Sequence, residues 1–448
     1  SILRTFMAYT KEGLMPNLFP EGDALPMYNT VDAALLFLDV VYEYYLETGD
    51  LEFVCEAFPV MEDIVFWYQK GTDFHLHSFP TRRSSDLIKM DSDGLIMAGG
   101  GLEQVTWMDV RIDKELPTPR HGKPVEINAY WYNGLRILEE LAPFVGKDGS
   151  AYGKLAEQVK KSFLEKFWME EEGYLKDVLN GTYEEKQFRC NQVFVLALPF
   201  QMVSQKQGQR VLQAVKEKLY TTAGLRSLEM EDPAFHPWIG GSQAERDRAY
   251  HQGTVWGFPL GAYFRAVLNY FPKEGKQEVR RGLDRLASWM QEGCLFHLAE
   301  IYDGAAPVMS KGCYAQAWSV GEILRVYKEI EGKKMNAVVK RTPAEWKSFF
   351  ESEEFVENFT YEGDDLGVSI KKSGECDGNW QMPKKDEQFM TEWKLWAPTA
   401  MEVSLELFSR GSSRENGDRK IASLAMTRGE KGVWSCAMQG AWYGTYYT

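Results

Sequence analysis

Amphipathic helical segments follow one another from residue 1 to about residue 330, and they constrain the fold of this chain more than any other feature. Apolar residues recur there every three to four positions, which is the period of one helix face. The pattern predicts helices at 1–12, 30–48, 51–69, 126–144, 151–167, 191–200, 206–219, 252–269, 276–292 and 315–330. Helices with one apolar stripe bury it against other helices, so we expect an all-α domain.

Unusual polar residues gather at the start of every second predicted helix. They are Asn29 and Asp32, Glu126 and Asn128, Arg189 and Asn191, His251 and Gln252, and Tyr314 and Gln316. In a toroid of alternating inner and outer helices, the N-termini of the inner helices meet at one end. Free N–H groups and the positive end of the helix dipole suit hydroxyl-rich ligands there. The spacing therefore predicts one shared binding site at one end of a helical toroid.

The period of the sequence changes towards the C-terminus. Residues 331–358 are charged and weakly patterned, and we interpret them as a linker. Polar and apolar residues then alternate over 392–397 and 402–408, with Pro398 and Gly432 marking turns. We expect a small antiparallel β-domain that ends within a strand-like run, so the domain looks truncated.

Composition narrows the possible partners. The net charge is −14, and phosphates are held by concentrated Lys and Arg, so we do not expect a nucleic acid partner. No apolar run approaches the roughly 18 to 20 residues of a membrane span. The six cysteines are scattered without a CxxC pair, which favours reduced thiols, a cytoplasmic location and no metal site or cofactor. A neutral polymer is compatible with this composition.

The stretch from residue 77 to residue 87 reads HSFPTRRSSDL and is basic and serine-rich within an acidic chain. It resembles the in-frame translation of a common sequencing adapter, and we interpret it as foreign to the natural protein. The alternative is a real surface loop. In either case Arg82 and Arg83 are not expected to form a phosphate or nucleic-acid site.

Two carboxylates stand out by their context. Glycoside hydrolysis generally needs two carboxyl groups, one protonated as general acid and one ionised. Asp109 lies in VTWMDV between a glycine-rich loop at 99–101 and a proline-rich loop at 117–124. The neighbouring Trp107 could desolvate this carboxyl and raise its pKa. Glu300 lies in HLAEIYDG, again in a loop flanked by aromatic residues.

Six separated motifs carry a family resemblance over residues 1 to about 330. They read YNTVDAALLF, TWMDV, TPRHGKPVEINAYWYNGLRIL, RDRAYHQGTVW, LAEIYDG and GCYAQAWSVGEILR. In this order they resemble the amylo-α-1,6-glucosidase family of glycogen debranching enzymes. The resemblance implies an (α/α)₆ barrel and an inverting hydrolase that cleaves α-1,6 branch points of glycogen or a limit dextrin. It also implies that Asp109 is the general acid and Glu300 the general base.

The same resemblance implies a set of sugar-binding residues. They are Asn29, Asp32, Trp107, Arg120, His121, Lys123, Glu126, Asn128, His251, Gln252, Trp256, Gln316 and Trp318. Each has a structural alternative: Glu126 could be only a carboxylate favoured by the helix dipole, and His251 a structural histidine. An inverting enzyme keeps a water opposite the leaving group, so the two catalytic carboxyl groups are expected roughly 6.5 to 9.5 Å apart.

A second resemblance covers about residues 359–448. YEGDDLGVSI, TEWKLWAPTAMEVSLELF and GAWYGTYYT resemble the immunoglobulin-like module that precedes the catalytic barrel of type I pullulanases. This implies a truncated β-sandwich and a (β/α)₈ barrel that is absent from this sequence. We expect Trp396, Trp434 and Trp442 to serve packing rather than glucan contact.

The chain also departs from the first family. Its relatives carry an N-terminal β-sandwich and a first inner helix with a GRDT-like motif, which this sequence lacks. We therefore expect weak hydrolysis or none from the chain as it stands, because misplacing a sugar by about 1 Å can cost on the order of 100-fold in rate. Two other functions stay open. One is a non-catalytic α-glucan-binding protein, and the other is a different (α/α)₆ glycosidase such as a glucoamylase or a trehalase.

Overall fold

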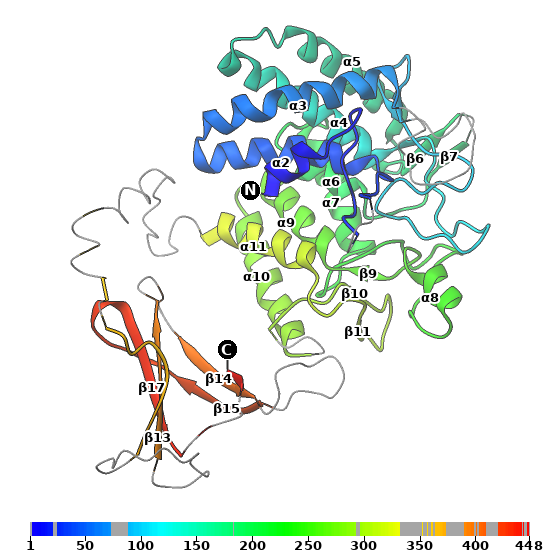
Figure 1. The fold of residues 1–448 in the computed structure, drawn as a ribbon. Helices are drawn as coiled ribbons and strands as arrows, with labels where there is room; N and C mark the ends of the chain where they lie inside the picture. The colour runs from blue at the N-terminus through cyan, green and yellow to red at the C-terminus, as the bar shows by residue number, and fades with distance from the viewer. Residues whose placement is uncertain are drawn as a thin grey trace. The chain divides into compact units, whose positions relative to one another are not determined.

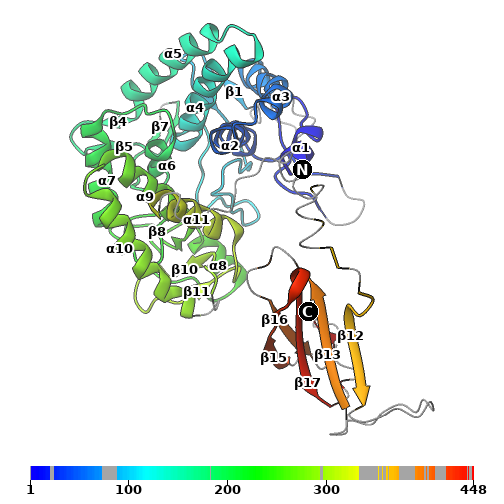
Figure 2. The same cartoon turned by 90° about the vertical axis from the view of Figure 1, so that its left-hand side faces the viewer.

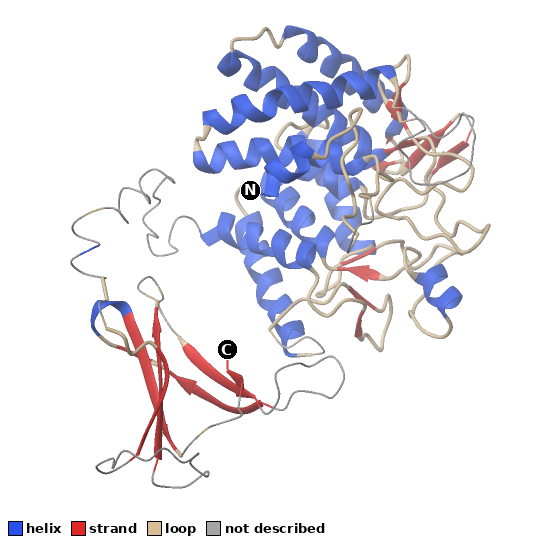
Figure 3. Cartoon of the chain, viewed as in Figure 1, coloured by secondary structure: helices blue, strands red, loops and turns tan. Residues whose placement is uncertain are grey.

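The chain divides into two compact units, Ser1–Ala337 and Val338–Thr448, in a computed structural model. The predicted foreign stretch 77–87 and most of the predicted linker 331–358 lie outside the residues that the structure describes. Figure 3 shows helices through most of the first unit and strands in the second. The described residues are 2–20, 25–72, 88–181, 183–292, 296–331, 352, 356, 360–361, 363–372, 389–397, 400, 403–408, 420–440, 442 and 446–447.

The first unit has an inner and an outer layer of helices. The inner series within the described residues is α2 (Asp32–Thr48), α4 (Val125–Leu141), α6 (Gln192–Ala197), α9 (Phe258–Tyr270) and α11 (Ala317–Glu331). Each inner helix packs on the next one in this series. Figure 2 shows the outer helices around them, namely α3 (Leu51–Lys70), α5 (Ser150–Phe167), α7 (Gln205–Lys218) and α10 (Gly275–Ala287). The layers alternate along the chain, as the polar spacing predicted.

Burial explains why the helices separate into these layers. Almost every residue of α4, α6 and α9 is buried, whereas α5, α7 and α10 each bury one stripe. A helix that is apolar all round has to be surrounded by protein, and a helix with a single apolar stripe stays at the surface. The sequences of the two sets therefore assign them to the inner and outer positions.

Ion pairs link α2 and α11, the first and last helices of the inner series. Arg325 on α11 binds Glu43 on α2, and Lys328 binds Glu47 at 2.7 Å. Partly exposed pairs of this kind contribute only about 0 to 1 kcal/mol each. Both helices also expose large apolar side chains, namely Leu36, Val40, Leu324 and Tyr327.

The predicted helix over 252–269 is wrong at its start, because residues 255–256 form a strand. This strand, β9 (Val255–Trp256), pairs with β8 (Leu225–Arg226) on one side and β10 (Ile301–Tyr302) on the other. β11 (Ser310–Lys311) completes an antiparallel sheet in the order β11-β10-β9-β8. Helix α9 begins only at Phe258, where Pro259 in its first turn needs no hydrogen-bond acceptor. The sheet places Glu300, which precedes β10, near the start of α9.

The prediction also missed the short helix α8 (Gln243–Ala249). Its N-terminus carries a capping box, in which Ser242 and Glu245 satisfy each other's backbone N–H groups. The remaining elements of this unit are short: α1 (Ile2–Ala8), β1 (Lys89–Met90), β2 (Ile96–Met97), β3 (Lys123–Pro124), β4 (Trp168–Met169), β5 (Tyr174–Leu175), β6 (Val178–Asn180), β7 (Tyr183–Glu185) and the 3₁₀ turns at Ala142–Val145 and Ser288–Gln291.

The second unit is an antiparallel β-domain, as the alternating pattern predicted. One sheet has the order β12-β13-β17-β16 and the other β15-β14-β18 (Figure 1). Side chains from both sheets form one buried cluster, which includes Trp393, Leu407 and Trp434. The strands are β12 (Gly367–Lys372), β13 (Phe389–Trp396), β14 (Ser404–Phe408), β15 (Lys420–Ala425), β16 (Thr427–Arg428), β17 (Val433–Gln439) and β18 (Tyr446–Tyr447). Its likeness to a pullulanase module stays a prediction.

The close packing of α9 on α11 can be tested by substituting a glycine at their contact. A Cβ atom added at Gly261 would lie 2.6 Å from Glu322 Cβ and 2.9 Å from the Glu322 carbonyl group. We expect Gly261→Ala to lower the free energy of unfolding by about 1 to 3 kcal/mol, because the backbones have to separate. Gly321→Ala on α11 is the matched control. Nothing lies within 4 Å of its added Cβ, so a stabilisation of about 0.5 to 1 kcal/mol is expected. Equal effects in urea denaturation would contradict this packing.

Candidate active site

Trp107 is the centre of an aromatic cluster at the start of two inner helices. Its ring meets His251, Trp256 and Phe258 edge to face at centroid distances of 5.3, 5.2 and 4.9 Å. Trp318 lies 6.5 Å from Trp107 and stacks on Phe258 at 4.2 Å. Phe258 opens α9 and Trp318 lies in the first turn of α11. Residues that are far apart in the sequence therefore meet at one loop tryptophan.

A hydrogen-bonded chain connects Trp107 to the start of a third inner helix. The indole Nε1–H donates to Asn191 Oδ1 at 2.8 Å, and Asn191 directly precedes α6. The amide of Asn191 then donates to Asp177 Oδ1, also at 2.8 Å. This fixes the position of Trp107 by a directed bond as well as by ring contacts.

Asp177 leads to a buried ion-pair network that includes the first turn of α4. Arg120 donates from Nε to Asp177 Oδ2 at 2.8 Å, and it binds both carboxylate oxygens of Glu126. The three residues are 3% exposed or less. Glu126 lies in the first turn of α4. The Arg120 guanidinium thus links the polar residues at the starts of α4 and α6.

The start of α2 also belongs to this region. Burial raises the pKa of Asp32 to about 6, and the negative charge of the nearby Glu126 contributes. Starts of all five inner helices of the described series therefore converge, which is what the polar spacing predicted.

Glu300, the proposed general base, is bound by Tyr250 and by a backbone N–H group. The Tyr250 hydroxyl donates to Glu300 Oε1, and the backbone N–H of Cys313 donates to Glu300 Oε2 at 2.7 Å. Burial raises the pKa of Tyr250 well above its usual value, and the charges of Glu300 and Asp109 add to this. Desolvation raises the pKa of Asp109, although its side chain also keeps a large area open to water.

Several predicted sugar-binding residues lie beneath this region and already have protein partners. Arg120 and Glu126 bind each other, and Asn128 joins β2 to α4 by bonding the backbone N–H and carbonyl of Ile96 at 2.7 and 3.1 Å. Gln252 donates to the Pro117 carbonyl and accepts from Arg189. Their present role is to hold loops in place, and a contact with sugar stays a prediction for each.

The other predicted residues differ in their surroundings. Lys123 bridges Asp91 and Asp93 at 2.7 and 2.8 Å, and His121 Nε2 bonds the Glu103 carbonyl at 2.6 Å. Asn29, Asp32, Trp107 and Gln316 are half-buried, Trp318 is exposed and Trp256 is fully buried.

His251 is unusual among them, because both ring nitrogens are buried and have no hydrogen-bond partner among the described residues. It stacks on Trp256 at 5.3 Å. Burial and then the charge of Arg189 lower its pKa well below the usual value, so the ring is neutral.

Sequence reasoning missed Asp177, Tyr250 and Phe258. Tyr250 directly precedes His251 in the motif RDRAYHQGTVW, so its position in this motif could have identified it as a candidate site residue. Asp177 lies in LKDVLN and carries no local signal of its own. Among the described ranges, no three His, Cys, Asp or Glu side chains are grouped to hold a metal ion, and no described helix is long and apolar enough to cross a membrane.

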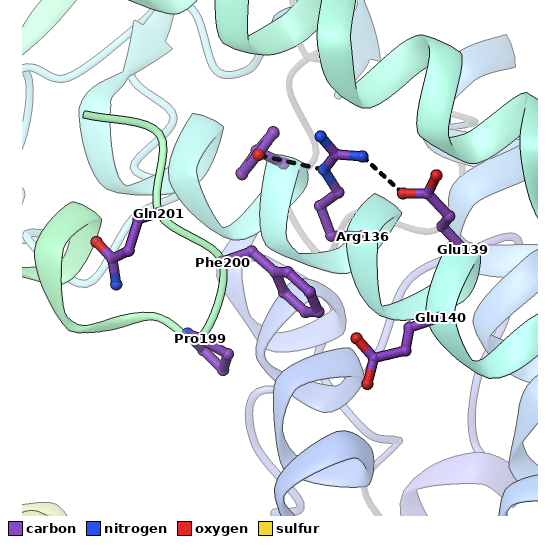
Figure 4. Close-up of a pocket in the computed structure, with 7 residues that line it drawn as sticks. Arg136, Glu139, Glu140, Pro199, Phe200 and Gln201 are labelled. Carbon is purple, nitrogen blue, oxygen red and sulfur yellow. Dashed lines mark hydrogen bonds and ion pairs between the residues drawn. The ribbon is translucent and has the colours of Figure 1, made fainter. Parts of the chain in front are cut away.

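A cavity of about 480 Å³ lies elsewhere on the first unit. Arg136, Glu139 and Glu140 from the second half of α4 line it together with Phe200 and Gln201, as Figure 4 shows. Arg136 is neutralised there by Glu139 at 2.7 Å. Glu126, at the start of α4, belongs to the opposite end of that helix, so this cavity is separate from the carboxylates around Tyr250.

The raised pKa of Asp32 predicts that removing its charge increases the free energy of unfolding, and that the increase depends on pH. An aspartate with a folded-state pKa of about 6 costs free energy when it ionises, fully above pH 6 and not at all below about pH 4. We expect Asp32→Asn to raise the free energy of unfolding by about 1 to 3 kcal/mol at pH 8. The gain should vanish at pH 4 in urea denaturation. A loss of stability at pH 8, or the same change at both pH values, would contradict the raised pKa of this carboxyl.

Comparisons with known proteins identify the family of the first unit. The profile of the family described as amylo-α-1,6-glucosidase matches residues 1–325. The glycogen debranching enzyme of Saccharomyces cerevisiae is 23% identical over 419 residues, which cover 72% of this chain. The match spans 27% of the yeast enzyme's length.

Solved structures share the fold of the first unit. Two structures of the GH63 mannosylglycerate hydrolase of Thermus thermophilus, one with Tris and one with glucose, each align with a TM-score of 0.50. The identities are 16% and 18%, and the alignments cover 73% of this chain and 87% and 86% of those chains. This likeness supports the toroid of inner and outer helices. Because the family profile extends over well more than half of the 448 residues, the chain belongs to the amylo-α-1,6-glucosidase family.

Proposed function

We propose that this chain is a glycoside hydrolase domain that cleaves α-1,6-glucosidic branch points of a glycogen-like α-glucan. One observation carries the proposal: the Tyr250 hydroxyl that donates to Glu300 belongs to a ring packed in the aromatic cluster of Trp107, which lies two residues before Asp109 in the same loop. Membership in the amylo-α-1,6-glucosidase family and the yeast debranching relative support the choice of substrate.

The environments of the two carboxyl groups favour different roles. Desolvation raises the pKa of Asp109, and a raised pKa suits a carboxyl to the role of general acid. Glu300 accepts hydrogen bonds from Tyr250 and from the Cys313 backbone. These two contacts fix the orientation of the carboxylate that is proposed as general base.

The reaction then proceeds by inversion. Asp109 donates its proton to the oxygen of the α-1,6 bond as the bond from the glucosyl C1 to that oxygen breaks. A water attacks C1 from the opposite face and gives a proton to Glu300. The products are β-glucose and a main chain with a free 6-hydroxyl. Glu300 loses its proton to solvent and Asp109 regains one, which restores the starting state.

Aromatic rings near the carboxylates suit the apolar faces of a sugar. Trp318 is 37% exposed and Trp107 is partly exposed, so each offers ring surface to a ligand. The net charge of −14 disfavours polyanionic ligands and is compatible with neutral ones. A neutral glucan fits both features.

Substitution of each carboxylate tests the proposal. With a relative's upstream region restored to the chain, we expect Asp109→Asn and Glu300→Gln each to lower the rate of glucose release from a singly glucosyl-branched dextrin by at least about 100-fold. With an activated leaving group such as fluoride, Asp109→Asn should lose far less, because that group departs without a proton. Thermal unfolding should remain close to that of the unsubstituted chain.

Asp113→Asn is the matched control, because it removes a carboxylate from the same loop. Asp113 has a φ of 51°, which asparagine also adopts readily. Near-normal turnover by Asp109→Asn or Glu300→Gln would reassign the residue concerned. Binding of the dextrin without any release of glucose, even with a relative's upstream region restored to the chain, would favour a glucan-binding protein instead.

A further inference from the structure

Glu300 is held from two sides by short-range contacts. The Tyr250 hydroxyl donates to Oε1, and the Cys313 backbone N–H donates to Oε2 at 2.7 Å. The backbone N–H of Glu300 also donates to the Cys313 carbonyl at 2.9 Å. The carboxylate therefore has one donor for each oxygen, and its orientation is set by both.

Gly312 leaves the space that this carboxylate occupies. Its φ is 71°, and an added Cβ would lie 2.6 Å from Glu300 Oε2. Any side chain there would both strain the backbone and displace the carboxylate. On this side, backbone geometry positions Glu300, while on the other side the phenol of Tyr250 does so.

Tyr250 is itself fixed in place. It follows α8 directly, and its carbonyl accepts from the Trp256 indole N–H at 3.0 Å. Its ring lies edge to face on Trp256 at 4.8 Å and tilted against His251 at 4.9 Å. A hydroxyl on such a packed ring reaches Glu300 with little loss of conformational freedom, which is the property of a good positioning group.

We propose that Tyr250 is a positioning residue that holds the Glu300 carboxylate in the orientation needed to take a proton from water. The proposal rests on the proposed function of Glu300. Tyr250 does not exchange its own proton in the reaction, because burial among rings and two carboxylates keeps the phenol protonated. Its hydroxyl remains a donor throughout the pH range in which Glu300 works.

Other charged groups around Glu300 do not replace this donor. Asp109 and Asp247 act on the Tyr250 hydroxyl as negative charges. Lys311 on the neighbouring strand β11 is bound to Asp303 at 2.6 Å. Cys313 contributes its backbone N–H, which no side-chain substitution removes. Loss of the phenol hydroxyl should therefore affect the Glu300 carboxylate directly.

The test is Tyr250→Phe, which keeps the ring and removes the donor. We expect kcat for release of glucose from a singly glucosyl-branched dextrin to fall by about 10- to 100-fold, with little change in KM. A purely structural role of Tyr250 would not separate kcat from KM in this way.

Tyr42→Phe is the matched control. The Tyr42 hydroxyl donates to Glu140 Oε1 at 2.7 Å, so the substitution removes the same kind of bond between α2 and the far end of α4. It should leave kcat and KM unchanged. Thermal unfolding of both variants reports whether any loss of activity comes from the fold.

A second measurement does not need turnover. Glutamate labelled with ¹³C at the carboxyl group gives a Glu300 signal that is identified by its loss in Glu300→Gln. The chemical shift of this signal at a fixed pH should differ in Tyr250→Phe from the unsubstituted chain and from Tyr42→Phe, because the carboxylate loses a hydrogen-bond donor. Equal chemical shifts, together with rates within twofold of the Tyr42→Phe control, would overturn the positioning role. Full activity of Glu300→Gln would instead overturn the proposed function and leave the chemical shift to decide the contact itself.

Discussion

The guanidinium of Arg120 is the buried charge on which the geometry of the candidate site depends. It binds Glu126 at the start of α4 and Asp177 in the loop before α6, and Asp177 in turn holds Asn191 and through it Trp107. Burying these charges costs desolvation energy that their attraction only partly offsets, and removing one partner of such a pair typically costs about 3 to 5 kcal/mol. The network therefore fixes the positions of side chains more than it stabilises the fold, because it links residues at the starts of neighbouring inner helices.

The helical period, the alternation of inner and outer helices and the convergence of polar residues at helix starts could be predicted from the sequence. It could not show which polar residues face a ligand. Glu126 at a helix start has the same local pattern whether it binds a sugar or an arginine. Its shared partner Arg120 also binds Asp177, which is 57 residues further along the chain. Long-range pairing of this kind leaves no periodic trace, so the predicted sugar-binding set included residues that the fold uses beneath the site.

The start of α9 shows a second limit. Val255 and Trp256 continue a helical apolar pattern, yet they form a strand because β8 and β10 provide hydrogen-bond partners on both sides. This strand matters for the site, since it brings Trp256 against Trp107 and places Glu300 just before β10. Asp109 and Glu300 could be proposed from motifs alone, but the contact of Tyr250 with Glu300 required the fold. The raised pKa of Asp109 and the two donors to Glu300 support the division into acid and base.

The stereochemistry of the first product tests the proposed mechanism most directly. Proton NMR of glucose released from a singly glucosyl-branched dextrin distinguishes the two anomers before they interconvert in solution. A water activated by Glu300 on the face opposite the leaving oxygen produces β-glucose first, with the α anomer appearing later by mutarotation. Appearance of α-glucose as the first product would contradict the assignment, because it would require a covalent intermediate on a carboxylate placed closer to the bond.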